Sequence, residues 1–136
     1  MYKTILVPIE LAHEHSGVNA IRIAKKLVND DGEIILVNVV GDIPAYIEVE
    51  LPMDLLNNSR KLALEKVTQI ARKEGIKSDV KIRTGHPANE ILAAAESYNA
   101  DLIIVASHQP GLSDYFLGST AARIVRHAQC PVLVDR

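Results

Sequence analysis

Residues 100–136, ADLIIVASHQPGLSDYFLGSTAARIVRHAQCPVLVDR, contain the pattern that decides the fold. The unbroken apolar run at residues 102–106 predicts a strand that is covered on both faces, as the strands of parallel sheets are. A glycine-containing loop follows, and Gly118-Ser119-Thr120 then opens an amphipathic helix. The predicted inward face of this helix holds Ala121, Ile124, Val125 and Ala128. Because ligands bind beyond the carboxyl ends of parallel strands, this order predicts an anion site at the start of the helix.

The composition of the whole chain bounds the class of protein. Its 136 residues suit one domain, predicted to span residues 1–136, and the single Cys130 implies no disulfide. Lys and Arg total 15 against 17 Asp and Glu, so the net charge of -2 favours neither nucleic acid nor anionic membranes. Only 4% of residues are aromatic, which leaves little for stacking on single-stranded nucleic acid. With no apolar run near about 18 residues and no leading signal-peptide segment, we expect a cytoplasmic protein without nucleic-acid or membrane partners.

Apolar runs alternate with amphipathic stretches from end to end, which indicates a parallel sheet wrapped by helices. Five strands are expected, at residues 4–9, 34–40, 80–83, 102–106 and 132–134, together with four helices. Pro131 suits the beginning of the last strand, because a strand's first residue can lack a ladder donor. The long connection at residues 41–54 contains two prolines and no clean period, so a short helix and a lid are both open there.

The first three helices are predicted from their apolar stripes and their ends. The inward residues are Ala20, Ile21, Ala24, Leu27 and Val28 in the first helix, Ala63, Val67, Ile70 and Ala71 in the second, and Ala88, Ile91, Leu92 and Ala95 in the third. Turn-forming residues 29–32 are expected to close the first helix. The second helix, residues 55–73, should end at Gly75, and Pro87 suits the first position of the third.

The chemistry of such a sheet is expected where the strand order reverses, above the first and fourth strands. Glu10 follows the first strand, and residues 106–109 follow the fourth. Gly118-Ser119 begins the helix that leaves the same edge. The topology therefore predicts that these three groups lie together.

Four stretches of the chain resemble one known family. They are ILVPIE at residues 5–10, TGHPANEIL at 84–92, ADLIIVASH at 100–108 and LGSTAARIVRHAQCPVLV at 117–134. Together they resemble small members of the universal stress protein family over nearly the whole chain. The resemblance implies an α/β fold with a Rossmann-like open five-stranded parallel sheet, order 3-2-1-4-5, and four helices on both faces. It also implies a stress-response regulator that binds ATP or AMP and forms a homodimer through its C-terminal strand.

The nucleotide loop departs from the family's pattern. Nucleotide-binding members have two glycines three residues apart after the fourth strand, and after nine more residues a third glycine with Ser or Thr. Here Ala106 and Gln109 stand in the first two places, and eight residues separate Gln109 from Gly118. Pro110 also removes one N–H donor from the loop, and Glu10 replaces the usual aspartate after the first strand. The closing Gly118-Ser119 pair is intact, and the shortened loop resembles a branch of the family in which nucleotide binding is still expected.

The resemblance assigns roles to individual residues. Phosphates would be held by Gly118, Ser119 and nearby backbone, the base by Val39 and the ribose by Glu10. The rest of the expected binding set is Pro8, Ala106, Ser107, His108, Gln109 and Thr120. Mg²⁺ could bridge the phosphates of ATP without a dedicated carboxylate cage. Any ATP hydrolysis or autophosphorylation is expected to be slow, because the sequence offers no positioned general base or arginine finger.

Each assignment has a structural alternative. Ser119 could simply cap a helix, Glu10 a turn, and Val39 could only pack in the core. His108, like His13 and His15, could be a solvated loop histidine rather than a catalytic or metal-binding group. Cys130 could be a reactive thiol or a small buried side chain.

The missing glycines leave a second function open, a nucleotide-independent dimeric interaction module of the same fold. A cluster of basic residues on the last helix is expected on its exposed side, where it complements the helix dipole.

Overall fold

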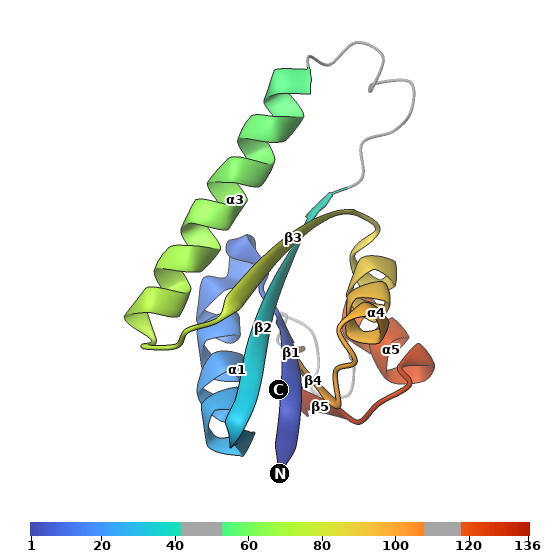
Figure 1. Cartoon of the computed structure of the whole chain (residues 1–136). Coiled ribbons are helices and arrows are strands. Elements are labelled where there is room, and N and C mark those ends of the chain that lie inside the picture. The colour runs from blue at the N-terminus through green and yellow to red at the C-terminus, as the bar shows by residue number, and fades with distance from the viewer. Residues whose placement is uncertain (42–52, 108–117) are drawn as a thin grey trace.

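The computed structural model describes residues 1–41, 53–107 and 118–136, and its centre is a five-stranded parallel sheet (Figure 1). The strand order is β3-β2-β1-β4-β5, as predicted. The strands are β1 (Tyr2–Pro8), β2 (Val28–Gly41), β3 (Asp79–Gly85), β4 (Leu102–Ala106) and β5 (Val132–Asp135). The helices are the short η1 (Leu11–His13), then α1 (Glu14–Leu27), α3 (Met53–Lys73), α4 (Pro87–Ser97) and α5 (Ser119–His127).

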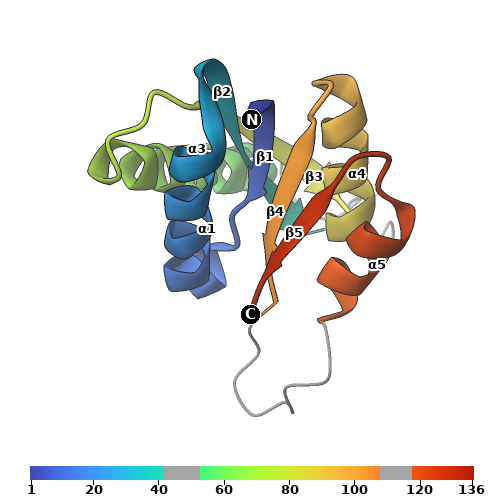
Figure 2. The same cartoon turned by 90° about the horizontal axis from the view of Figure 1, so that it is seen from below.

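Helices cover both faces of the sheet, α1 and α3 on one side and α4 and α5 on the other (Figures 1 and 2). Successive residues of the inner strands therefore enter two different cores. Ile5 and Val7 pack with α1 and α3, whereas Leu6 between them packs with α4 and α5. This double burial is why the central strands show no alternation of apolar and polar residues.

The junction of α1 and β2 differs from the prediction. Val28 was expected on the helix and residues 29–32 in a turn, but α1 ends at Leu27 and β2 begins at Val28. Residues 29–32 form an irregularity inside the strand, because the pairing moves from Tyr2 with Val28 to Thr4 with Glu33. The turn-forming residues thus bulge out of a ladder instead of ending an element.

The end of α3 is as predicted, with Gly75 beyond the last helical turn at a φ of +70°. The N–H of Gly75 donates to the Arg72 carbonyl at 3.1 Å, and the N–H of Ile76 donates to the Ala71 carbonyl at 3.1 Å. These two bonds form a Schellman motif, which requires a residue in the left-handed conformation. The motif places Glu74 beside α1.

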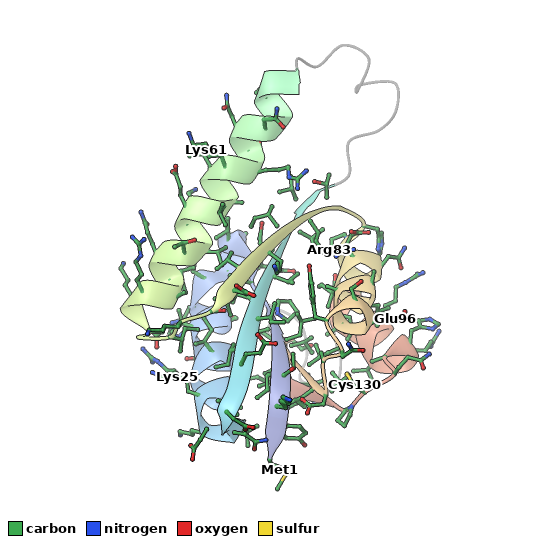
Figure 3. All side chains as sticks on the ribbon, in the orientation of Figure 1. Met1, Lys25, Lys61, Arg83, Glu96 and Cys130 are labelled. Carbon is green, nitrogen blue, oxygen red and sulfur yellow. The ribbon has the colours of Figure 1, made fainter. Side chains whose placement is uncertain are left out.

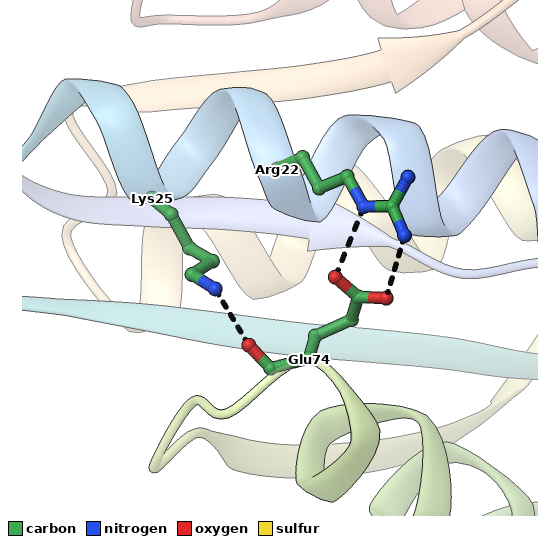
Figure 4. A network of polar contacts seen from close by, with 3 residues as sticks. All are labelled: Arg22, Lys25 and Glu74. Carbon is green, nitrogen blue, oxygen red and sulfur yellow. Dashed lines mark hydrogen bonds and ion pairs between the residues drawn. The ribbon is translucent and has the colours of Figure 1, made fainter.

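Glu74 then joins α3 to α1 (Figure 4). Its carboxylate accepts from Arg22 Nε at 3.1 Å and from the second Arg22 nitrogen at 3.3 Å. Its carbonyl accepts from Lys25 Nζ at 2.6 Å. A two-pronged arginine–carboxylate pair fixes orientation as well as distance, so it holds the two helices in register on their shared face of the sheet.

The inward face of α5 was only partly predicted. Ala121 and Ile124 are buried, whereas Val125 is 46% exposed and Ala128 lies just beyond the helix. With nine residues, α5 covers only the part of the sheet near β4 and β5, so its apolar stripe is narrower than its sequence suggests. The stripe predicted for the second helix, which is α3, is buried throughout.

Two further predictions concern a lid and membrane-spanning segments. The possible lid at residues 41–54 falls almost wholly on residues 42–52, outside the described part of the chain. Among the helices of the described ranges, none combines the length and apolar character needed to cross a bilayer.

Candidate functional site

A cavity of about 420 Å³ opens at the carboxyl ends of β1, β2 and β4. This is the edge at which the strand order reverses between β1 and β4, where ligands bind in open α/β sheets. On the α4 and α5 side the cavity is apolar, with walls that include Val39, Ile91 and Val105. Across the strand ends it becomes more polar, where Ser16 and Asn38 contribute to the lining.

Half of the ten predicted site residues line this cavity. They are Pro8, Glu10, Val39, Ala106 and Thr120. Ser119 lies beside it in a neighbouring groove, and Ser107 and Gly118 lie between β4 and α5. The last two, His108 and Gln109, belong to residues 108–117, which are outside the described part of the chain.

Ser107 is a buried connection point rather than an open donor. Its N–H donates to the Asp135 carbonyl at 2.9 Å, and its Oγ accepts from the N–H of Gly118 at 3.1 Å. The backbone of Ser107 thereby ties the end of β4 to the end of β5, and its side chain ties it to the start of α5. The family resemblance implies that the Gly118 N–H binds phosphate. In this structure the same N–H donates to the Ser107 hydroxyl.

The start of α5 has no side-chain cap. Gly118 occupies the capping position at φ -59° and ψ 155°, a conformation open to any residue, and Ser119 is the first helical residue. The alternative in which Ser119 caps the helix is therefore not what the structure shows. Of the N–H groups at this helix start, that of Gly118 donates to Ser107 Oγ, and those of the first turn receive no bond from a side chain of the capping residue.

Glu10 is exposed at the mouth of the cavity, and its side chain makes no capping bond to η1. The backbone just before it is held from two sides. The N–H of Ile9 donates to the Val37 carbonyl at 2.7 Å, and Asn38 Nδ2 donates to the Ile9 carbonyl at 2.8 Å. Glu10 thus projects from a fixed peptide, which suits a carboxylate that accepts hydrogen bonds from a ligand's hydroxyl groups.

Sequence reasoning missed several residues that line the cavity. Asn38, Ser16, Gly17 and Ser59 were not among the candidates. Asn38 had a visible signal, since it is the single polar residue in the apolar run at 34–40. Ser59 had none, because it stands among other polar residues of a long helix.

Metal and thiol chemistry find little support in the described ranges. No group of three or more His, Cys, Asp or Glu side chains there could hold a metal ion. Cys130 is half-buried just before β5 (Figure 3), and it is not among the residues that line the cavity. Burial and the nearby Asp101 carboxylate raise the pKa of its thiol, so the protonated form is favoured.

The fold and the cavity together define a Rossmann-like α/β protein with a ligand-sized space at its strand-order switch point. The sequence profile of the universal stress protein family matches residues 1–136, and the chain belongs to that family. It is 36% identical to the universal stress protein MJ0531 of Methanocaldococcus jannaschii, over 98% of this chain and 82% of that one.

Solved structures agree with this assignment. The hypothetical protein MJ0577 superposes with a TM-score of 0.82 at 29% identity, covering 98% of this chain and 95% of the other. Two more distant structures share the fold, one a universal stress protein in complex with cAMP (TM-score 0.67, 21% identity, 99% and 97% coverage). The other is the Archaeoglobus fulgidus universal stress protein in complex with dAMP (TM-score 0.70, 18% identity, 99% and 98% coverage).

Proposed function

We propose that this chain is a regulatory protein that binds an adenine nucleotide, ATP or AMP, in the cavity at the carboxyl ends of β1, β2 and β4. The observation that carries the proposal is the position and volume of the cavity. It lies at the switch point of the sheet, and about 420 Å³ is within the range of small-molecule sites. The complexes of distant relatives with cAMP and dAMP make adenine nucleotides the first ligands to test.

The walls of the cavity suggest how a nucleotide would lie. The apolar part beside Val39 and Pro8 suits the base, and Glu10 at the mouth suits the ribose hydroxyls. Thr120 and the first turn of α5 would meet the phosphates, with Ser119 next to them. Glu10 is the one carboxylate among the described lining residues, so Mg²⁺ would enter with ATP on its phosphates.

Hydrolysis of the bound nucleotide is expected to be slow at most. The one carboxylate of the described lining, Glu10, stands at the mouth beside the expected ribose, so the cavity offers no carboxylate base next to the phosphates. A binding protein whose surface or assembly responds to the ligand fits this site better than a nucleotide hydrolase.

The test is thermal unfolding with ATP, ADP and AMP, each with and without Mg²⁺. A ligand at about 100 times its Kd adds roughly 2.7 kcal/mol to the free energy of unfolding, and Tm should rise by about 5 to 10 °C. Glu10→Gln, Gly118→Val and Ser119→Ala should reduce the rise. Ser97→Ala, at an exposed position on α4 away from the cavity, is the matched control for Ser119→Ala and should leave the rise intact.

A second function becomes the better account if millimolar nucleotide produces no rise. In that case the chain would act as a nucleotide-independent dimeric interaction module. The bond from the Gly118 N–H to Ser107 Oγ favours this candidate, because it occupies a donor that a phosphate would otherwise use.

A further inference from the structure

A second hollow of about 330 Å³ lies next to the nucleotide cavity, between the beginning of α4 and the outer face of α5. We call it the basic groove, and it is lined by His86, Ser119, Thr120, Ala122, Arg123, Arg126 and His127. Its described lining contains two arginines and two histidines and no Asp or Glu. On a chain with a net charge of -2, such a concentration of basic side chains is unexpected unless it meets an anion.

The basic groove adjoins the cavity. Thr120 lines both, and the adjacent residues His86 and Pro87 line one hollow each. A ligand that fills the cavity and extends past Thr120 would therefore reach the groove. The end of the ligand that lies nearest α5 is the end that would reach the groove.

Charge decides which end of a nucleotide belongs there. The described lining of the cavity has no Lys or Arg. Its groups that suit negative charge are His13 and the first turn of α5, and the Glu10 carboxylate opposes them. Each phosphate beyond the first adds negative charge with no guanidinium or ammonium group in that lining to pair with it. The arginines that can neutralise it stand in the groove.

Arg123 is the best-placed of these arginines. It lies one turn along α5 from Ser119, and its Nε donates to Asn89 Oδ1 on α4 at 3.1 Å. This bond holds the guanidinium in the space between the two helices and uses one of its five N–H donors. Arg126 and His127 belong to the last turn of α5, where they also complement the helix dipole, whereas Arg123 has no such explanation.

We propose that the basic groove binds the phosphate chain of the nucleotide, with Arg123 and His86 in direct contact with it. The chain would then bind ATP and ADP in preference to AMP and adenosine. This inference rests on the proposed function, and it assigns to side chains of α4 and α5 a role that glycine-rich loops fill by backbone N–H groups.

The experiment is isothermal titration of the full chain with adenosine, AMP, ADP and ATP. The wild-type protein should bind ATP at least about tenfold more tightly than AMP. Arg123→Gln should weaken ATP binding by about five- to tenfold, as expected for one charge-assisted contact, and leave adenosine within about twofold. Arg123→Lys should weaken ATP binding less than Arg123→Gln does, because lysine keeps the positive charge but not the planar guanidinium group.

Controls separate the groove from general effects. Arg72→Gln changes an exposed arginine of α3 outside the groove and should leave all four affinities unchanged. Adenosine binding by Arg123→Gln reports that the variant is folded. Inorganic tripolyphosphate should displace ATP from the wild-type protein and leave bound adenosine in place.

The outcomes are distinct. Equal affinity of the wild-type protein for AMP and ATP, or an equal loss for adenosine and ATP in Arg123→Gln, would overturn the groove's role and leave the nucleotide cavity standing. Absence of binding for every nucleotide and for adenosine would remove both the proposed function and this inference.

Discussion

Ser107 shows how a single buried residue organises the candidate site. It joins three elements, since its backbone N–H donates to Asp135 at the end of β5 and its Oγ accepts from Gly118 at the start of α5. The end of β4 and the start of α5 are therefore held together by one residue. This fixes the position of Gly118 and, with it, the direction in which the first turn of α5 points.

Cys130 supports a prediction about pH. Burial, and to a smaller extent the Asp101 carboxylate, raise the pKa of its thiol above the ordinary value. A raised pKa in the folded state means that its contribution to stability is present below the pKa of the unfolded chain and is lost as pH rises through the folded pKa. Alkylation by iodoacetamide between pH 7 and 10 should therefore have a higher midpoint for the folded protein than for the chain in urea.

Asp101, the second cause of the raised pKa of Cys130, provides a control for this measurement. Asp101→Asn removes the negative charge and keeps one of the two acceptor oxygens. It can therefore accept from only one of the N–H groups of Lys3 and Thr4, which donate to separate carboxylate oxygens at 2.9 and 3.0 Å. The midpoint should move part of the way toward that of the unfolded chain. A folded midpoint at or below the unfolded one would contradict the assignment of Cys130 as an unreactive thiol.

The sequence predicted where a candidate residue lies when its place follows from a strand. Glu10, Val39 and Ala106 all line the cavity because each lies near the carboxyl end of a strand, and parallel strands end at one edge. Asn38 was missed because its role depends on a neighbouring strand, since its amide bonds the Ile9 carbonyl across the sheet. Such a partner, 29 residues away, has no sequence signal of its own.

At the scale of elements, the irregularity in β2 leads to a prediction about Gly32. A Cβ placed on Gly32 would lie 2.6 Å from the Lys3 carbonyl oxygen and 2.8 Å from Val28 Cγ2. The nearest atom belongs to the backbone of β1, which is paired with β2 and cannot move away easily, so Gly32→Ala should lower the free energy of unfolding by roughly 1 to 3 kcal/mol. Urea denaturation measures the change directly.

Gly41→Ala is the matched control for Gly32→Ala. Gly41 ends the same strand, and a Cβ there would meet nothing within 4 Å. Its effect should stay within about 0.5 kcal/mol. If both variants unfold at the same urea concentration, β1 and β2 are not as close at the bulge as described here.

Helix ends were predicted best where a residue with a distinctive backbone conformation marks them. Gly75 ends α3 and Pro87 begins α4 as expected, because a left-handed residue and a fixed φ leave few alternatives. Residues 29–32 were misread since Asn, Asp and Gly serve bulges as well as turns. The helical spacing of Val125 predicted an inward position. How much of the sheet α5 covers depends on tertiary packing, which that spacing does not show.

At the scale of the molecule, the strand order located the site before any contact was known. The order in which the chain adds strands reverses between β1 and β4. Such a reversal leaves a crevice at the carboxyl ends of these strands, and the cavity is there. The basic groove could not be foreseen in the same way. It needs His86 from the start of α4 and Arg123 from α5, and only packing of the two helices brings these residues together.

The free edge of β5 carries the last prediction, a homodimer in which the two β5 strands pair across a two-fold axis. The carbonyls of Pro131 and Asp135 accept from Ile103 in β4 and from Ser107 just after it. By the two-residue period of a strand, Val132 and Val134 direct their backbone groups outward. Light scattering at micromolar concentration should give twice the mass of one chain. Val134→Pro removes an outward N–H but no bond to β4, so it should give a folded monomer. Its far-ultraviolet circular dichroism should match that of the wild-type protein. A monomeric wild-type chain, or a Val134→Pro variant that remains dimeric, would show that this edge is not the interface.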